Sequence, residues 1–240
     1  MPRFPRAFLK GHPHHILQRG HDRKPVFAHD DDSRVYLDNL AEQNERLEIG
    51  VIAYGLMTNH VHLLPPPEHD GYDLSLLMRV LAARQTRHVN RLEQRTGTLW
   101  EGRFRCSIAD STEHLLAGCR YIELNPVRAG IVATAGDHRW SSYRQRTTSQ
   151  VAEIPLTAPA CVTSSGQNEP ERQRRYRDYI ACDCSGAELE IIRTAAHRNQ
   201  LAGGDHFKRE IEQKLSRRLL HRQPGRPARI RQTRAADNDK

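Results

Sequence analysis

Residues 57–64 read MTNHVHLL, an apolar run interrupted by two histidines one residue apart. Side chains alternate between the two faces of a β-strand, so the pattern predicts a strand with His60 and His62 on one face and Val61 on the other. The two histidine Cα atoms are then ~6.5 Å apart, which allows both imidazoles to bind one divalent ion. A His-x-His pair fits an ordinary polar face equally well, and two ligands alone do not define a metal site.

A second unusual pattern lies in residues 110–130, which read DSTEHLLAGCRYIELNPVRAG. The spacing of its apolar residues predicts a helix that ends near Asn125, because the following Pro126 disfavours a helical residue before it. Tyr121 and Asn125 are four residues apart and share a face of this helix. By composition alone, a half-buried tyrosine and a helix-ending asparagine are the simpler interpretation.

These segments, together with residues 13–20 (PHHILQRG), 97–104 (GTLWEGRF) and 140–143 (WSSY), resemble the REP-associated tyrosine transposases. That group is related to the single-tyrosine transposases of the IS200-like superfamily, whose signature is two histidines around a hydrophobic residue. The resemblance is strong over residues 1–145 and loose thereafter. Several ordered motifs over that length are far more specific than the two histidines alone.

The resemblance implies a reaction and a role for individual residues. Tyr121 would be the nucleophile, and His60, His62 and Asn125 would hold one Mg²⁺ or Mn²⁺ ion. The implied reaction is DNA transposition by cleavage of single-stranded, hairpin-forming repetitive extragenic palindromes, through a 5′-phosphotyrosine intermediate and a free 3′-OH. The residues expected to contact DNA are the arginines Arg3, Arg6, Arg19, Arg103 and Arg105.

The order of predicted elements is strand, helix, strand, strand, helix, strand, helix. This order suits an α+β fold with an antiparallel sheet and helices on one face, and the family that the chain resembles has a ferredoxin-like arrangement of this kind. We expect a basic tail over residues 1–11, a single-tyrosine transposase (HUH endonuclease-like) domain over 12–145, a linker over 146–170, a small helical basic region over 171–222 and a basic disordered tail over 223–240.

Composition agrees with a nucleic-acid partner. The formal net charge of the 240-residue chain is +8, which favours binding to a polyanion. The chain lacks an apolar run long enough to cross a membrane and a hydrophobic signal segment, so we expect a cytoplasmic protein without a membrane partner. The five cysteines lack zinc-site spacing, and we expect reduced thiols.

Other functions remain open at this stage. A replication initiator or relaxase shares the two histidines and the tyrosine but usually supplies a third histidine or an acidic ligand. A non-catalytic protein that binds repeat hairpins needs neither the metal nor the nucleophile, and a plain metal hydrolase does not need Tyr121. We expect a monomer, with a homodimer as the alternative.

Overall fold

The computed structural model describes residues 6–110, 112–149, 153–182, 186–216 and 219. Its centre is an antiparallel sheet in the order β2-β3-β1-β4, built from β1 (His14–Arg19), β2 (Ala53–Met57), β3 (His60–Leu64) and β4 (Arg105–Ile108). Helix α1 (Asp30–Leu47) joins β1 to β2, and α2 (Gly71–Leu92) joins β3 to β4. This is the ferredoxin-like order of elements, so the predicted α+β class and antiparallel sheet are confirmed.

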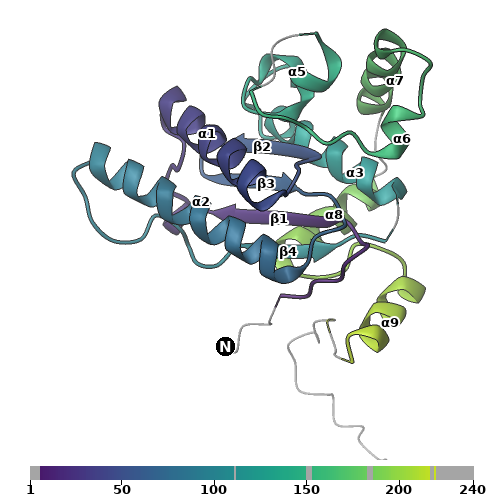
Figure 1. Cartoon of the computed structure of the whole chain (residues 1–240), viewed down its shortest axis with the longest axis horizontal. Coiled ribbons are helices and arrows are strands. Elements are labelled where there is room, and N and C mark those ends of the chain that lie inside the picture. Colours follow the sequence, from purple (N-terminus) through teal and green to yellow (C-terminus); the bar gives the residue numbers. More distant parts are fainter. Residues whose placement is uncertain (1–5, 111, 150–152, 183–185, 217–218, 220–240) are drawn as a thin grey trace, which may run out of the picture.

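Helices α1 and α2 lie side by side over one face of the sheet (Figure 1). Their apolar stripes and the sheet enclose the main hydrophobic core, to which β3 contributes Val61 and Leu63. Val61 is fully buried, as the alternation along the strand predicted. Strand β3 ends at Leu64, directly before three prolines that have no backbone N–H to donate to a sheet.

The opposite face of the sheet is covered as well. Helix α3 (Thr112–Glu123) packs on β2 and β3, and α8 (Gly186–Arg198) packs on β1 and β4. We expected helices on one face only, which α1 and α2 satisfy and α3 and α8 do not. The reason is that both faces of the sheet are apolar. Ala53 and Leu64 are buried on the face that carries the histidines, and Val61 and Leu63 are buried on the opposite face. Strands that are apolar on both faces need a layer on each side.

Helix α3 approaches β2 most closely at Gly55. A Cβ atom on Gly55 would lie 3.1 Å from Ile122 Cγ2 and 3.3 Å from the Ile122 carbonyl oxygen. That carbonyl lacks the usual donor four residues on, because Pro126 has no backbone N–H. Glycine in the strand and proline after the helix thus let the end of α3 lie against the sheet, with Asn125 at the start of α4 (Asn125–Arg128).

The rest of the chain folds back on this framework. Ser142, at the start of α5 (Ser142–Thr147), accepts a hydrogen bond of 3.1 Å from the backbone N–H of Tyr54 in β2. Side chains of α6 (Ala160–Thr163) and α7 (Glu169–Ala181) share a second core with α3, and α9 (Asp205–Lys214) packs near Ile108 at the end of β4. Two short 3₁₀ helices, His21–Arg23 and Ala135–Asp137, complete the described elements.

The expected domain boundaries stay predictions, and the tail over 223–240 lies outside the described residues. Ile154, within the expected linker, is buried in the main core. Among the described residues, Cys106, Cys119, Cys161 and Cys182 are free thiols, as expected, and Cys119 is in the core. No helix of the described part of the chain combines the length and the apolar character needed to span a bilayer.

Because α3 lies so close to Gly55, the addition of a single methyl group at this position should destabilise the fold. Gly55→Ala should lower the free energy of unfolding by about 1–3 kcal/mol, because the new Cβ is opposed by the Ile122 carbonyl of the backbone, which cannot swing aside. Urea unfolding measures the change.

Gly118→Ala, on α3 at the same interface, is the matched control. Its Cβ would lie 3.5 Å from Leu64 Cδ2, an ordinary contact, so alanine in the helix should be neutral or stabilising. Equal stabilities of the Gly55→Ala variant and the wild type would show that α3 does not rest on β2 in this way.

Candidate functional site

The site is built on the face of the sheet that α3 and α8 cover. In the β1–β3 register Leu17 pairs with His62 and Arg19 pairs with His60, so all four side chains point toward that face. His62 is 1% exposed, whereas His60, at the end of β3, is half-buried. The sheet therefore presents two imidazoles, one in the interior and one at the rim.

The end of α3 brings the Asn125 carboxamide onto the two histidines. Asn125 Nδ2 lies 2.7 Å from His62 Nε2 and 3.5 Å from His60 Nε2. The Nδ1 atom of each histidine has a hydrogen-bond partner on the side away from Asn125. His62 Nδ1 lies 2.8 Å from His15 Nε2, and His60 Nδ1 lies 2.7 Å from Asn59 Oδ1. In the tautomer that carries its proton on Nδ1, each histidine turns the lone pair of Nε2 to the carboxamide of Asn125.

This arrangement fits a divalent ion. Ligating histidines commonly donate their second ring N–H to a neighbouring acceptor, which fixes the tautomer and the orientation of the ring. Rotation of the Asn125 carboxamide about its Cβ–Cγ bond exchanges Nδ2 for Oδ1 and would present an oxygen beside both Nε2 atoms. Within the described residues, no three or more His, Cys, Asp or Glu side chains form a metal-binding group, and the side chain that faces both Nε2 atoms is the amide of Asn125.

Tyr121, near the end of α3, lies beside the histidines, and Asn125 follows it by four residues at the start of α4. Its ring packs edge-to-face against His62, with the ring centroids 5.7 Å apart, and against His15 at 5.5 Å. The side chain is only 7% exposed. The structure thus brings together the four residues that the resemblance had assigned to the centre, Tyr121, His60, His62 and Asn125.

Burial keeps this cluster uncharged. Desolvation, helped by the charges of Arg19 and His197, lowers the pKa of His60 to about 4. Desolvation also lowers the pKa of His15 to about 3 and that of His62 well below its usual value. The pKa of Tyr121 is raised, chiefly by burial, against the opposing charges of nearby arginines. At neutral pH the imidazoles are therefore free bases, as metal ligands must be, and the phenol keeps its proton.

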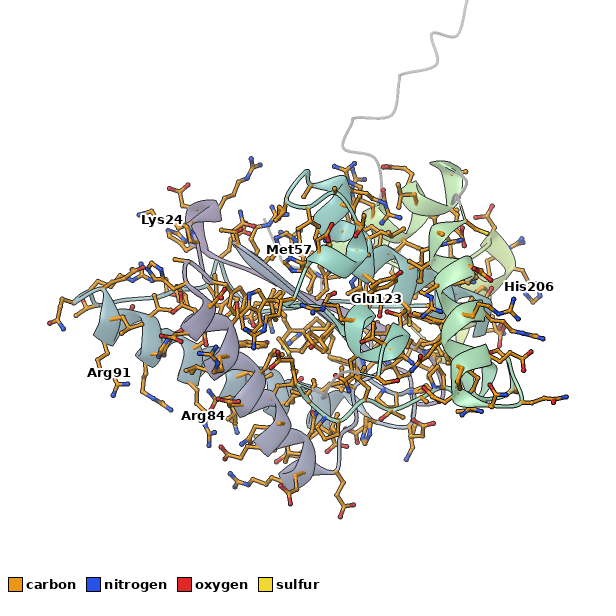
Figure 2. All side chains as sticks on the ribbon, turned by 90° about the horizontal axis from the view of Figure 1, so that it is seen from above. Lys24, Met57, Arg84, Arg91, Glu123 and His206 are labelled. Atoms are coloured by element: carbon orange, nitrogen blue, oxygen red, sulfur yellow. The ribbon has the colours of Figure 1, made fainter. Side chains whose placement is uncertain are left out.

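Glu123, two residues from both Tyr121 and Asn125, fixes the end of α3 from inside. It is fully buried and accepts hydrogen bonds from the hydroxyls of Ser142 (2.6 Å) and Tyr176 (2.9 Å). Figure 2 shows Glu123 in the interior of the molecule, among the teal and green helices. Burial raises the pKa of its carboxyl group. This network ties α3 to α5 and α7 and so orients the helix that carries the candidate nucleophile.

The five arginines expected to contact DNA do not form one group. Arg3 lies outside the described residues. Arg6 places its guanidinium 3.8 Å from the centre of the Phe104 ring, Arg103 is exposed, and Arg19 stands beside His60. Arg105 is engaged within the protein, since it donates to the backbone oxygen of His197 and lies 4.0 Å from a Glu101 carboxylate oxygen.

The arginines of α2 lie on the far side from the site. Arg84 and Arg91 point outward from α2 (Figure 2), which covers the other face of the sheet. Arg84 is paired with Glu42 of α1, with one nitrogen–oxygen distance of 2.8 Å. The arginines of α2 therefore do not contribute positive charge to the candidate centre, whereas Arg19 at the end of β1 does.

Sequence reasoning missed two residues of this site. His15 of β1 was not among the predicted site residues, yet its Nε2 atom lies 2.8 Å from Nδ1 of His62. His197 of α8 lies close enough to His60 and His62 to lower their pKa values. The alternation along β1 could have placed His15 on the histidine face, but no pattern in the sequence places α8 over β1 and β4.

Comparison with known proteins agrees with the fold and with the family that the sequence resembles. Residues 9–125, just under half of the chain, match the family model described as Transposase IS200 like. The family resemblance seen in the sequence is thereby confirmed. The matched segment contains Tyr121, both histidines and Asn125.

Two solved structures are similar. One is a REP-associated tyrosine transposase bound to a REP hairpin, with a TM-score of 0.53 and 16% identity over 66% of this chain and 96% of that one. The other is a putative transposase from Deinococcus radiodurans, with a TM-score of 0.36 and 21% identity over 48% of this chain and 91% of that one. Comparison with curated proteins gives no match.

The buried neutral histidines predict how stability depends on pH. The pKa values of His14, His15 and His60 are about 4, about 3 and about 4 in the folded state, all below their usual value of 6.5. Below pH 6.5 the unfolded chain takes up protons that the folded chain does not. The free energy of unfolding should therefore fall with decreasing pH, by up to ~1.4 kcal/mol per pH unit for each such histidine.

Urea unfolding between pH ~7.5 and ~5 measures this slope, in a range above the titration of most carboxyl groups. His15→Gln should reduce the slope because one buried base is removed. A free energy of unfolding that is constant over this range would mean that the imidazoles are solvated or charged in the folded protein.

Proposed function

We propose that this protein is a metal-dependent, site-specific endonuclease and strand transferase for single-stranded DNA. In this proposal it cleaves hairpin-forming repetitive extragenic palindromes through a phosphotyrosine intermediate, as a transposase of the REP-associated group. The domain assignment and the fold of the REP-bound relative support the substrate class. A monomer in the cytoplasm, with the domain over residues 12–145 as its catalytic part, belongs to the same proposal.

One observation carries the chemistry. The Nε2 atoms of His60 and His62 face the carboxamide of Asn125, at 3.5 and 2.7 Å from its Nδ2, and Tyr121 packs on His62 one helical turn before Asn125. A site for hydrolysis alone would not need a buried phenol on the ligand-bearing helix. Nor would a protein that only binds DNA need two lone pairs aimed at one amide.

The reaction follows from what these groups can do. The Tyr121 oxygen attacks phosphorus, a bond forms between them, and the bond from phosphorus to the 3′-oxygen breaks. Attack requires loss of the phenolic proton, and in the balanced step that proton ends on the 3′-oxygen that leaves. The strand stays attached as a 5′-phosphotyrosine, so its phosphodiester energy is kept for rejoining.

His60, His62 and Asn125 would hold Mg²⁺ or Mn²⁺, which supplies positive charge for the scissile phosphate in the transition state. The residues around this set keep the ligands in place. His15 and Asn59 fix the two imidazoles, and Glu123 fixes the helix of Asn125 and Tyr121. The chain thus prepares both the ligand set and the nucleophile from rigid elements.

Adduct formation tests the proposal. The full-length protein is mixed with Mn²⁺ and a labelled single-stranded palindrome hairpin with its natural flanks, and covalent complexes are resolved on a denaturing gel. Tyr121→Phe should abolish the adduct because the nucleophilic oxygen is gone. His62→Ala should reduce the rate at least ~100-fold because a ligand is lost. Both variants should bind the hairpin nearly as well as the wild type.

Tyr72→Phe is the matched control, since Tyr72 is an exposed tyrosine (74%) on the opposite layer of the fold, and its rate should be unchanged. Hairpin binding by the wild type without any adduct, with Mg²⁺ or Mn²⁺, would favour the non-catalytic hairpin-binding protein. An adduct that survives Tyr121→Phe would identify a different nucleophile.

A further inference from the structure

The turn between β2 and β3 carries a side chain that contacts both a candidate metal ligand and a neighbouring loop. The turn consists of Thr58 and Asn59. The Asn59 Nδ2 atom donates a hydrogen bond of 3.0 Å to the Arg23 backbone oxygen, and its Oδ1 atom lies 2.7 Å from His60 Nδ1. Both ends of one short, half-buried carboxamide are therefore engaged, one with a backbone group and the other with an imidazole.

The Arg23 carbonyl decides which way the carboxamide is turned. A carbonyl oxygen can only accept a hydrogen bond, so the group that faces it must be the amide nitrogen of Asn59. The amide oxygen then faces His60, and this oxygen also can only accept. The contact of 2.7 Å with His60 Nδ1 is therefore a hydrogen bond that the imidazole donates. A neutral imidazole carries one proton, so Nε2 of His60 keeps a free lone pair.

His62 is under no such constraint. Its Nδ1 atom lies 2.8 Å from His15 Nε2, and an imidazole nitrogen donates or accepts according to its tautomer. The other nitrogen of His15, Nδ1, is buried without a hydrogen-bond partner among the described residues, so no third group decides between the two arrangements. Of these two histidines, His60 is the one whose tautomer is set by groups with fixed donor and acceptor roles.

The loop that supplies the Arg23 carbonyl is fixed to the β2–β3 turn by its backbone. The Gly20 N–H donates a hydrogen bond of 2.8 Å to the Asn59 backbone oxygen, and the Val26 N–H donates one of 2.8 Å to that of Thr58. Between these points the chain turns through Arg23 and the residue before it, whose φ angles of 57° and 53° are unusual outside glycine. A turn of this kind persists only where its surroundings hold it, and this one is anchored at both ends.

We propose that Asn59 is a positioning residue for the metal site: held by the Arg23 carbonyl, it keeps the His60 proton on Nδ1 and so keeps Nε2 available as a ligand. This inference rests on the proposed function and deepens it, because it assigns control of one ligand to the loop after β1. Without Asn59, water can donate to or accept from Nδ1, and the proton can occupy either nitrogen. The tautomer with its proton on Nε2 has no lone pair for an ion beside Asn125.

Two substitutions separate this role from a merely structural one. Asn59→Ala removes both contacts, whereas Asn59→Asp removes the donor to Arg23 and keeps an oxygen that accepts from His60. Calorimetric titration of the full-length protein with Mn²⁺ alone, at neutral pH, measures the affinity. Asn59→Ala should weaken binding about 10- to 100-fold, and Asn59→Asp less than ~3-fold. Equal losses in the two variants would show that Asn59 only holds the loop and would overturn the proposal.

Asn90→Ala is the matched control. Asn90 also donates to a backbone oxygen, that of Gly97 at 2.9 Å, but it belongs to α2 on the opposite face of the sheet. The Mn²⁺ affinity of this variant should equal that of the wild type. A loss as large as that of Asn59→Ala would mean that removal of any such carboxamide weakens the site, and the specific role of Asn59 would be wrong.

A second measurement reads the tautomer without metal or DNA. Long-range ¹H–¹⁵N correlation NMR distinguishes a protonated from an unprotonated ring nitrogen. His60 should carry its proton on Nδ1 in the wild type and in Asn59→Asp, and Asn59→Ala should show a mixture of both tautomers. A wild-type His60 protonated on Nε2, or a tautomer unchanged by Asn59→Ala, would overturn the proposal even if Mn²⁺ binds. The expected tautomers in a protein that binds no Mn²⁺ would support the role of Asn59 and count against the proposed metal-dependent function.

Discussion

The enclosure of polar side chains between β3 and α3 is the constraint on which the rest of the structure depends. Imidazoles, a phenol and an amide are removed from water there, and each must stay uncharged and find a partner. Hydrogen-bond contacts between His60 and Asn59 and between His62 and His15 meet that need, and the Nε2 atoms of both histidines face Asn125. Burial has a free-energy cost for polar side chains, and here it keeps the imidazoles neutral, which is the form that the proposed metal site requires.

Three parts of the chain that are distant in sequence meet at this enclosure. The sheet supplies the histidines, the α3–α4 junction supplies the phenol and the carboxamide, and α8 covers the same face of the sheet over β1 and β4. The histidines, the phenol and the carboxamide lie within the segment that matches the IS200-like transposase model, and α8 lies beyond it. Gly55 and Pro126 allow the end of α3 to lie against β2. Gly55 has no side chain to obstruct the helix, and Pro126 ends the helical hydrogen bonding there because it has no backbone N–H.

Much of this could be predicted from local sequence. Alternation placed His60, His62 and Val61 correctly, helical spacing put Tyr121 and Asn125 on one face, and proline marked the end of the helix. Those features depend on neighbours in sequence. The second helical layer and the contact between His62 and His15 depend on residues 47 or more positions apart. The spacing of residues along the chain does not predict such long-range contacts, so only the structure reveals them.

The identity of the nucleophile is the central claim, and mass spectrometry of the covalent adduct tests it most directly. Trypsin cleaves after Arg120 and Arg128, so the peptide YIELNPVR carries Tyr121 as its only tyrosine. After nuclease trimming, this peptide should gain the mass of the 5′-phosphorylated nucleotide that remains, and it should be absent from the digest of a Tyr121→Phe protein. The same added mass on any other peptide would contradict the assignment of Tyr121 and the role given to the helix that carries it.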